Sequence, residues 1–177
     1  MSRVFECLAA VAACFAAGCA SLPDYAPPPQ RAALPGAESG GLGYFLSMSN
    51  PNADAYIVQG IAAHTEGTGF RWTYAHPVLR FRLPRVERLR FMMDFALPET
   101  TFHVTGPVAL SIALNGRAFD HPRFDHPGQQ HYEREVPPDF LHANAINLVA
   151  IDPDKLYIAP QDGVKLGFPL SRVGFVE

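Results

Sequence analysis

Cysteine is scarce in this sequence of 177 residues, and all three copies lie within the first nineteen positions. The chain that follows Cys19 therefore has no thiol for a disulfide framework, a CxxC redox motif or a thiolate metal site. A strong charge of either sign is missing too, because the formal net charge is only -3 at pH 7. That balance gives no indication of a nucleic-acid or polyanion partner.

Catalytic motifs are also missing. The sequence contains no Gly-x-Ser-x-Gly elbow, no Gly-rich phosphate loop after a strand and no His-Glu-x-x-His pair. The sequence shows neither a recognisable pair of nucleophile and general base nor a recognisable set of metal ligands. It therefore predicts a protein that is not an enzyme and needs no cofactor. A metal-dependent hydrolase is the weaker alternative, which depends on the histidine-rich stretch described below.

A sustained helical period is absent, whereas alternation of apolar and polar residues recurs along the chain. Residues 108–114 are apolar at every second position, and Asn115-Gly116 then tolerates the positive φ angles of a tight hairpin. Half-buried antiparallel strands alternate in this way. The sequence therefore predicts an all-β fold, a jelly-roll-like antiparallel β-sandwich of about eleven short strands.

Other alternating runs extend this prediction. We expect strands at 79–83, 89–97, 132–136 and 146–151, and a further short strand at 102–104. The 17 prolines and 14 glycines suit a fold of short strands and turns.

The first eighteen residues have a different character. One positive charge near Met1 is followed by an apolar run from Leu8 to Ala17, which is shorter than the roughly 20 residues of a membrane-spanning helix. The run ends in Ala16-Ala17-Gly18-Cys19, which resembles the lipobox of bacterial lipoproteins. That resemblance implies cleavage before Cys19, lipidation of Cys19 and attachment to a membrane. Ala20 resembles lipoproteins passed on to the outer membrane, so we expect a location in the bacterial cell envelope, facing the periplasm.

The stretch after Cys19 has the composition of a tether. Its first part is rich in proline and its second part in glycine, with few large apolar residues. We therefore divide the sequence into a signal peptide (1–18), a lipidated flexible tether (19–42) and a β-sandwich domain (43–177).

The central part of the domain resembles a known fold family. The residues that carry the resemblance are the Leu-x-Ile-x-Leu-Asn-Gly run of 110–116, the Val136-Pro137 pair and Asn147 near the start of a later strand. This succession is similar to the galactose-binding-like β-sandwich, a jelly-roll module attached to many glycoside hydrolases and cell-surface proteins. The resemblance covers roughly residues 72–176. It implies either carbohydrate binding or a structural spacer, and it transfers no binding residue.

Aromatic side chains supply one group of candidate ligand contacts. Trp72, Tyr74 and Tyr132 lie in predicted strands, and aromatic faces suit the apolar face of a pyranose. Core packing is the ordinary role of aromatics in a sandwich, so we expect Phe70, Trp72 and Tyr74 to close one end of the core. Any of these aromatics that is exposed becomes the predicted sugar platform.

A histidine-rich stretch from Asp120 to His131 supplies the second group. His121, His126 and His131 are spaced five apart beside two aspartates, and imidazole and carboxylate ligands suit divalent ions. The spacing does not define a tetrahedral site, so we predict no metal. We expect instead a long solvated loop on the sandwich rim that borders a ligand.

Arginines form a third group. Arg80, Arg82, Arg88 and Arg90 would share one outer sheet face if strands 79–83 and 89–97 pair. Such a face would offer bidentate contacts to lipid phosphate or to an acidic polysaccharide. The alternative is an ordinary solvated sheet face.

These observations predict a lipid-anchored envelope protein whose β-sandwich is a non-catalytic binding module for carbohydrate or another envelope polymer. The alternative is a structural or assembly lipoprotein that docks a protein partner in the envelope.

Overall fold

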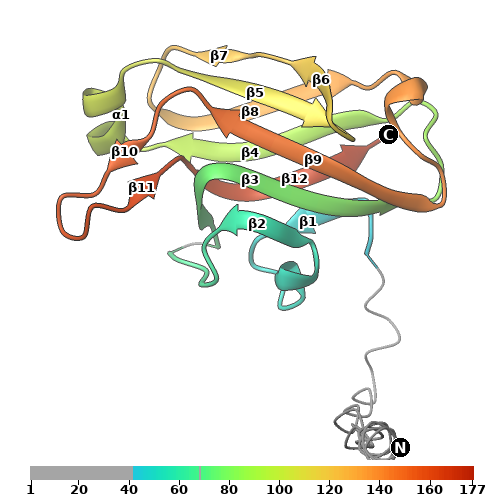
Figure 1. Ribbon diagram of the computed structural model, residues 1–177, viewed down its shortest axis with the longest axis horizontal. Coiled ribbons are helices and arrows are strands. Elements are labelled where there is room, and N and C mark those ends of the chain that lie inside the picture. Colours follow the sequence, from blue (N-terminus) through green and yellow to red (C-terminus); the bar gives the residue numbers. More distant parts are fainter. Residues whose placement is uncertain (1–41, 68) are drawn as a thin grey trace, which may run out of the picture. The chain divides into compact units, whose positions relative to one another are not determined.

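The structure of the protein is a computed structural model that describes residues 42–67 and 69–177. The predicted signal peptide, Cys19 and the tether up to residue 41 lie outside the described residues. Residues 42–177, apart from 68, form the predicted jelly-roll-like antiparallel β-sandwich, with its longest strands running along the length of the domain (Figure 1).

One layer of the sandwich has the strand order β6, β5, β9, β3, β2. Its strands are β2 (Ile57–Ile61), β3 (Arg71–Leu83), β5 (Val108–Leu114), β6 (Arg117–Asp120) and β9 (Ala145–Pro153). A two-residue strand, β7 (Arg123–Phe124), also pairs with β5. We call this layer sheet B.

The second layer, sheet A, has the order β12, β4, β8, with β1 also paired to β12. Its strands are β1 (Phe45–Ser47), β4 (Arg90–Leu97), β8 (Gly128–Glu135) and β12 (Pro169–Val176). The first residues of β3 join this layer, because Arg71 and Trp72 pair with Leu170 and Pro169 of β12. Strand β3 therefore belongs to sheet A at its start and to sheet B at its end.

Short elements close the ends of the sandwich. They are two 3-10 turns (Ala53–Ala55 and Pro138–Phe140), α1 (Glu99–Thr105), β10 (Tyr157–Ile158) and β11 (Lys165–Leu166). Figure 1 shows α1, β10 and β11 together at one end. Within the described ranges, no helix has both the length and the hydropathy needed to cross a membrane.

The core between the layers is built from the alternating apolar positions of the long strands. Five phenylalanines are fully buried there: Phe81, Phe91, Phe95, Phe168 and Phe175. Several of their rings meet at tilted or edge-to-face angles, as in the contact of Phe95 with Phe168. Burying each such ring contributes on the order of 2 kcal/mol, so these side chains provide much of the driving force for folding.

The predicted hairpin at Asn115-Gly116 is confirmed. Asn115 and Gly116 have φ angles of 51° and 79°, and β5 and β6 pair on either side of them. The Asn115 amide also donates to the carbonyl oxygen of Phe140 and to the side chain of Asn147. This turn therefore ties the edge of sheet B to the segment before β9.

The predicted strand at 102–104 is wrong, because these residues belong to helix α1. Pro98 supplies the carbonyl oxygen that accepts the first helical hydrogen bonds, from the N–H groups of Thr101 and Phe102. Gly106, with a φ of 66°, ends the helix and donates its N–H to the carbonyl oxygen of Phe102. A seven-residue helix is too short to show a helical period in the sequence.

The predicted arginine face shared by two neighbouring strands is wrong. Strand β3 pairs with β9 and β2 at its arginine-bearing end, whereas β4 lies between β12 and β8. The connection at 84–89 crosses from one layer to the other. Arg80 and Arg82 therefore lie on sheet B, and Arg90 lies on sheet A.

The long loop expected from Asp120 to His131 is also wrong. Strand β7 lies within this stretch and β8 begins at Gly128, so His131 is a strand residue paired with Asp94. Strand β8 lies at the edge of sheet A, where its backbone pairs with β4 on one side and several of its polar side chains are exposed. A polar run can therefore form a strand that the apolar pattern does not indicate.

Candidate functional site

The start of β3 places its polar side chains inside the fold and its aromatic side chains outside. Arg71 is 6% exposed and Thr73 is fully buried, whereas Phe70 and Trp72 are half-buried and Tyr74 is exposed. The expectation that these aromatics close one end of the core is therefore wrong. We call Phe70, Trp72 and Tyr74 the aromatic strip.

Hydrogen bonds explain why polar groups can occupy the inner positions. The Thr73 hydroxyl donates to the carbonyl oxygen of Phe168 and accepts the Phe168 N–H, each at 2.9 Å. The Arg71 guanidinium contacts the Asp54 carboxylate at 2.5 Å and donates to the Thr65 hydroxyl. Buried polar groups are stable when they are paired in this way. Alternation along the strand then forces the aromatic strip outward.

Two members of the aromatic strip, Phe70 and Trp72, border a depression on the outer face of sheet A, whereas Tyr74 lies outside its lining. The Trp72 and Phe70 rings meet edge to face with centroids 6.5 Å apart. They line the depression, which has an empty volume of about 750 Å³. The other walls come from β4, β8, β12 and the residues beside them, among them Ala96, Pro98, Gln129, Pro169 and Ser171.

Two polar side chains of this depression are available to a ligand. Neither the Gln129 amide nor the Ser171 hydroxyl forms a side-chain hydrogen bond with another described residue. An amide and a hydroxyl both donate and accept hydrogen bonds. Together with the Trp72 ring they provide an apolar surface with hydrogen-bonding groups at its rim, the usual composition of a site for a small polar ligand.

A network of charged residues lies next to the depression on the same outer face. Asp94 accepts hydrogen bonds from His131 Nδ1 at 2.6 Å and from Arg172 Nε at 2.7 Å. His131 Nε2 lies 3.2 Å from a Glu133 oxygen, and Glu133 also contacts Arg90 at 3.1 Å. The hydrogen bonds to Asp94 and then to Glu133 raise the pKa of His131 above its ordinary value of 6.5. This network fixes the side chains of β4, β8 and β12 beside the aromatic strip.

The predicted site residues separate into three groups. Trp72 and Tyr74 are in the aromatic strip, and His131 is in the adjacent charged network. Tyr132 lies in the core with its hydroxyl donating to Asp120 at 2.6 Å, and burial followed by this bond raises its pKa. His121 and His126 lie elsewhere on the surface.

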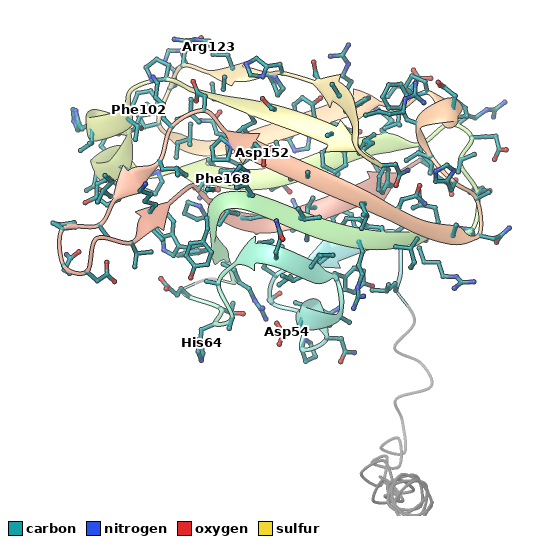
Figure 2. All side chains as sticks on the ribbon, viewed as in Figure 1. Asp54, His64, Phe102, Arg123, Asp152 and Phe168 are labelled. Atoms are coloured by element: carbon teal, nitrogen blue, oxygen red, sulfur yellow. The ribbon has the colours of Figure 1, made fainter. Side chains whose placement is uncertain are left out.

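His121 belongs to a polar row on the outer face of sheet B. Its Nδ1 lies 2.9 Å from the Ser111 hydroxyl, while Asp152 pairs with His76 at 3.1 Å. Figure 2 shows Asp152 on β9. The hydroxyl and the carboxylate contact different imidazoles, so these residues do not form a Ser-His-Asp triad. Among residues 42–67 and 69–177, no three His, Cys, Asp or Glu side chains are arranged to hold a metal ion.

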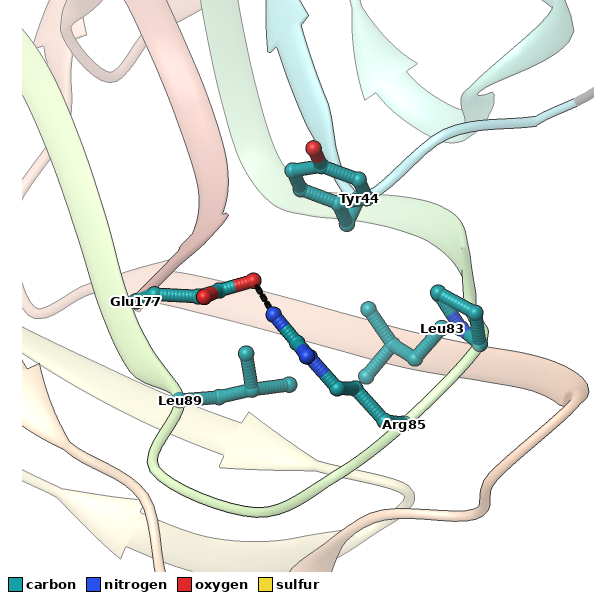
Figure 3. Close-up of a pocket in the computed structure, with 6 residues that line it drawn as sticks. Tyr44, Leu83, Arg85, Leu89 and Glu177 are labelled. Atoms are coloured by element: carbon teal, nitrogen blue, oxygen red, sulfur yellow. Dashed lines mark hydrogen bonds and ion pairs between the residues drawn. The ribbon is translucent and has the colours of Figure 1, made fainter.

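A smaller cavity lies at the end of the sandwich near the C-terminus. Its empty volume is about 240 Å³, and Tyr44, Leu83 and Leu89 line it. An ion pair between Arg85 and Glu177 also lies in it (Figure 3). Because its two charged groups are already paired with each other, this cavity offers a ligand less than the depression beside the aromatic strip.

Sequence reasoning missed Phe70, Gln129 and Ser171 as site residues. The sequence could have identified Phe70, since it alternates with Trp72 and Tyr74 in one strand. No sequence pattern identifies Gln129 or Ser171, because they lie near Trp72 only through the pairing of β4 with β8 and β12. That pairing joins segments far apart in the chain.

No protein-family model matches the sequence, and no curated protein matches it. The fold is similar to a family 35 carbohydrate binding module from Clostridium thermocellum, at a TM-score of 0.48 and 13% identity, covering 75% of this chain and 98% of that one. It is also similar to such a module from Paenibacillus barcinonensis, at a TM-score of 0.45 and 11% identity, covering 76% and 99%. A third similarity is to an exo-β-1,3-galactanase from Phanerochaete chrysosporium, at a TM-score of 0.44 and 8% identity, covering 76% and 29%. No ligand assignment follows from similarities at this level.

Proposed function

We propose that this protein is a lipid-anchored component of the bacterial cell envelope whose β-sandwich is a non-catalytic carbohydrate-binding module. The sugar stacks on the aromatic strip and forms hydrogen bonds with Gln129 and Ser171. The observation that carries this proposal is the outward orientation of Phe70, Trp72 and Tyr74, which include the chain's single tryptophan. Outward-facing aromatic rings beside unpaired polar groups suit the alternating apolar and hydroxyl surfaces of a pyranose.

The single tryptophan makes the site directly observable. Because Trp72 is the only tryptophan of the chain, intrinsic tryptophan fluorescence reports on this depression alone. The full chain in detergent is screened on a glycan array, and the glycans retained are titrated while Trp72 emission is recorded. We expect a shift or quenching of Trp72 emission that saturates with glycan concentration.

Matched tyrosine variants test the location of the site. Tyr74 is 37% exposed in the aromatic strip, and Tyr44 is 50% exposed in the cavity near the C-terminus. We expect Tyr74→Ala to weaken glycan binding several-fold and Tyr44→Ala to leave it unchanged. On the array, Trp72→Ala reduces binding by about 30-fold, which corresponds to the roughly 2 kcal/mol of a central aromatic contact.

An unchanged Trp72 spectrum with every retained glycan would contradict this location of the site. Silence of the whole array, together with a partner protein cross-linked in cells, would favour a structural or assembly lipoprotein instead.

A further inference from the structure

Most arginines of the described chain are already neutralised by a carboxylate. Seven of them form ion pairs: Arg71, Arg85, Arg90, Arg117, Arg123, Arg134 and Arg172. Among the described residues, no carboxylate pairs with Arg80, Arg82 or Arg88. Arg88 lies in the connection before β4, whereas Arg80 and Arg82 both lie on the outer face of sheet B.

These two arginines stand beside exposed aliphatic side chains. Arg80 is the cross-strand partner of Leu148, and Arg82 is the partner of Ile146. Leu148 is 42% exposed and Ile146 is 43% exposed. Directly paired residues of an antiparallel ladder project from the same face about 5 Å apart. We call Arg80, Arg82, Ile146 and Leu148 the β3–β9 face.

The β3–β9 face combines exposed aliphatic side chains with guanidinium groups that have no carboxylate partner. Exposed aliphatic residues in strand interiors lose the stabilisation that burial would give them, roughly 25 cal/mol for each Å² of apolar area. No carboxylate of the described chain pairs with the adjacent guanidinium groups. Arg80 Nε donates to the carbonyl oxygen of Ala55 at 2.7 Å, which leaves its other N–H groups for an anion. An extended anionic surface with apolar groups beneath it matches both properties at once.

A second copy of the chain is a poor match for this face. A symmetric contact through it would gather the Arg80 and Arg82 side chains of both copies in one interface that contains no carboxylate of this face. Repulsion between these charges opposes such a dimer. An anionic phospholipid bilayer, by contrast, offers phosphate to the guanidinium groups and apolar acyl chains to the aliphatic side chains.

The start of the described domain also lies at this end of β3. The N–H of Arg82 donates to the carbonyl oxygen of Gly43 at 3.3 Å. The chain before residue 43 therefore joins the domain beside the β3–β9 face. If Cys19 is anchored in a membrane, the residues between it and Gly43 can span at most about 80 Å, so the domain stays within that reach of the membrane.

We propose that the β3–β9 face docks on a bilayer surface that contains anionic phospholipids. Arg80 and Arg82 bind headgroup phosphates, and Ile146 and Leu148 contact the boundary between headgroups and acyl chains. This surface belongs to sheet B, whereas the aromatic strip lies on sheet A. The docking therefore does not depend on the proposed sugar site.

The test is hydroxyl-radical footprinting of the full chain anchored on vesicles. One set of vesicles contains phosphatidylcholine alone, and the other contains phosphatidylcholine with phosphatidylglycerol. We expect the labelling of Ile146 and Leu148 to fall several-fold on the phosphatidylglycerol vesicles only. Val104 and Ile158, which are 70% and 59% exposed on other elements, serve as internal controls whose labelling stays constant.

Charge variants identify the groups responsible. The double variant Arg80→Gln/Arg82→Gln should lose the protection. Its equilibrium constant for docking should fall about 30-fold, because each arginine near an anionic surface contributes about 1 kcal/mol. The double variant Arg117→Gln/Arg123→Gln removes the same charge from ion-paired positions, and Figure 2 shows Arg123 on β7. That control should keep the protection. If the double variant misfolds, the single variant Arg82→Gln replaces it in the test. The Arg82 side chain forms no hydrogen bond to the described chain, so its loss should not disturb folding.

Four outcomes would overturn the proposal. The first is equal labelling of Ile146 and Leu148 on both kinds of vesicle, and the second is protection that survives in the folded Arg80→Gln/Arg82→Gln variant. The third is protection that requires an added protein. The fourth is loss of protection when a low concentration of inorganic phosphate is added, which would assign the arginines to free phosphate instead of lipid headgroups. None of these outcomes bears on glycan binding at Trp72.

Discussion

The buried hydroxyl of Thr73 determines which face of β3 the aromatic side chains occupy. It forms hydrogen bonds with both backbone groups of Phe168, and Arg71 two residues earlier is held by Asp54. A threonine and an arginine in a strand are ordinarily interpreted as outward-facing. Their partners lie far away in the chain or on another element, so the sequence pattern alone predicts the opposite orientation.

His131 makes the stability of sheet A depend on pH. Its imidazolium donates to Asp94 and Glu133, and its pKa is raised. The resulting stabilisation is therefore fully present below the unfolded-state pKa of about 6.5 and is lost as the pH rises through the higher folded-state pKa. Urea unfolding of wild type and His131→Gln across this range should show a stability difference that shrinks with rising pH. His126→Gln, an exposed histidine in the turn before β8, serves as the control.

A constant stability difference between wild type and His131→Gln at every pH would contradict this role of His131. Titration of the His131 ring followed by NMR gives an independent measurement of the direction of the pKa shift.

At the scale of elements, the close approach of β2 to β3 requires Gly60 of β2. Gly60 has a φ of 73°, and a Cβ atom there would lie 2.2 Å from the carbonyl oxygen of His76. The register of β2 against β3 shifts at this point. We expect Gly60→Ala to lower the free energy of unfolding by about 3 kcal/mol or more, since backbone strain and steric overlap both contribute.

Gly116→Ala separates these two contributions. Gly116 has a similar φ of 79°, but nothing lies within 4 Å of its ideal Cβ position. This variant should lose only about 1 kcal/mol, from backbone strain alone. Equal losses for Gly60→Ala and Gly116→Ala in urea unfolding would show that the contact with His76 does not matter.

The elements that could be predicted from the sequence are those with strong local signals. Alternation predicts the strands at 79–83, 89–97 and 108–114, and Asn115-Gly116 predicts the hairpin. Helix α1 has too few residues for a period, and the strands within 120–131 have no apolar pattern. These elements form because they cover an end or an edge of a sheet that other segments build.

At the scale of the whole molecule, strand order could not be predicted, since it depends on pairing between distant segments. The prediction that β3 and β4 pair follows from their closeness in the chain, which is only a tendency in β-proteins. Trp72 and Tyr74 were found as candidates from their residue type. Their neighbours Gln129 and Ser171 follow only from the order β12, β4, β8.

The proposed membrane attachment is tested by changing Cys19. Without its sulfur no lipid can be attached, so Cys19→Ser should leave the chain unprocessed at its N-terminus. Mass spectrometry of the purified protein would show the retained leader and the missing acyl mass. Partitioning of the variant into detergent with the same lipid mass as wild type would contradict the proposal. The variant Cys14→Ser, within the apolar run, is the matched control and should be processed normally.

Strand β3 carries the aromatic strip at one end and Arg80 and Arg82 at the other, and these ends belong to different layers. The two sheets of a sandwich are about 10 Å apart. The distance between the two outer surfaces is therefore that spacing plus the side chains on each outer face. A bilayer bound on one side and a polysaccharide on the other would be held at a fixed, short spacing. The domain would then connect the bilayer to the polysaccharide, and β3 would contribute residues to both binding surfaces.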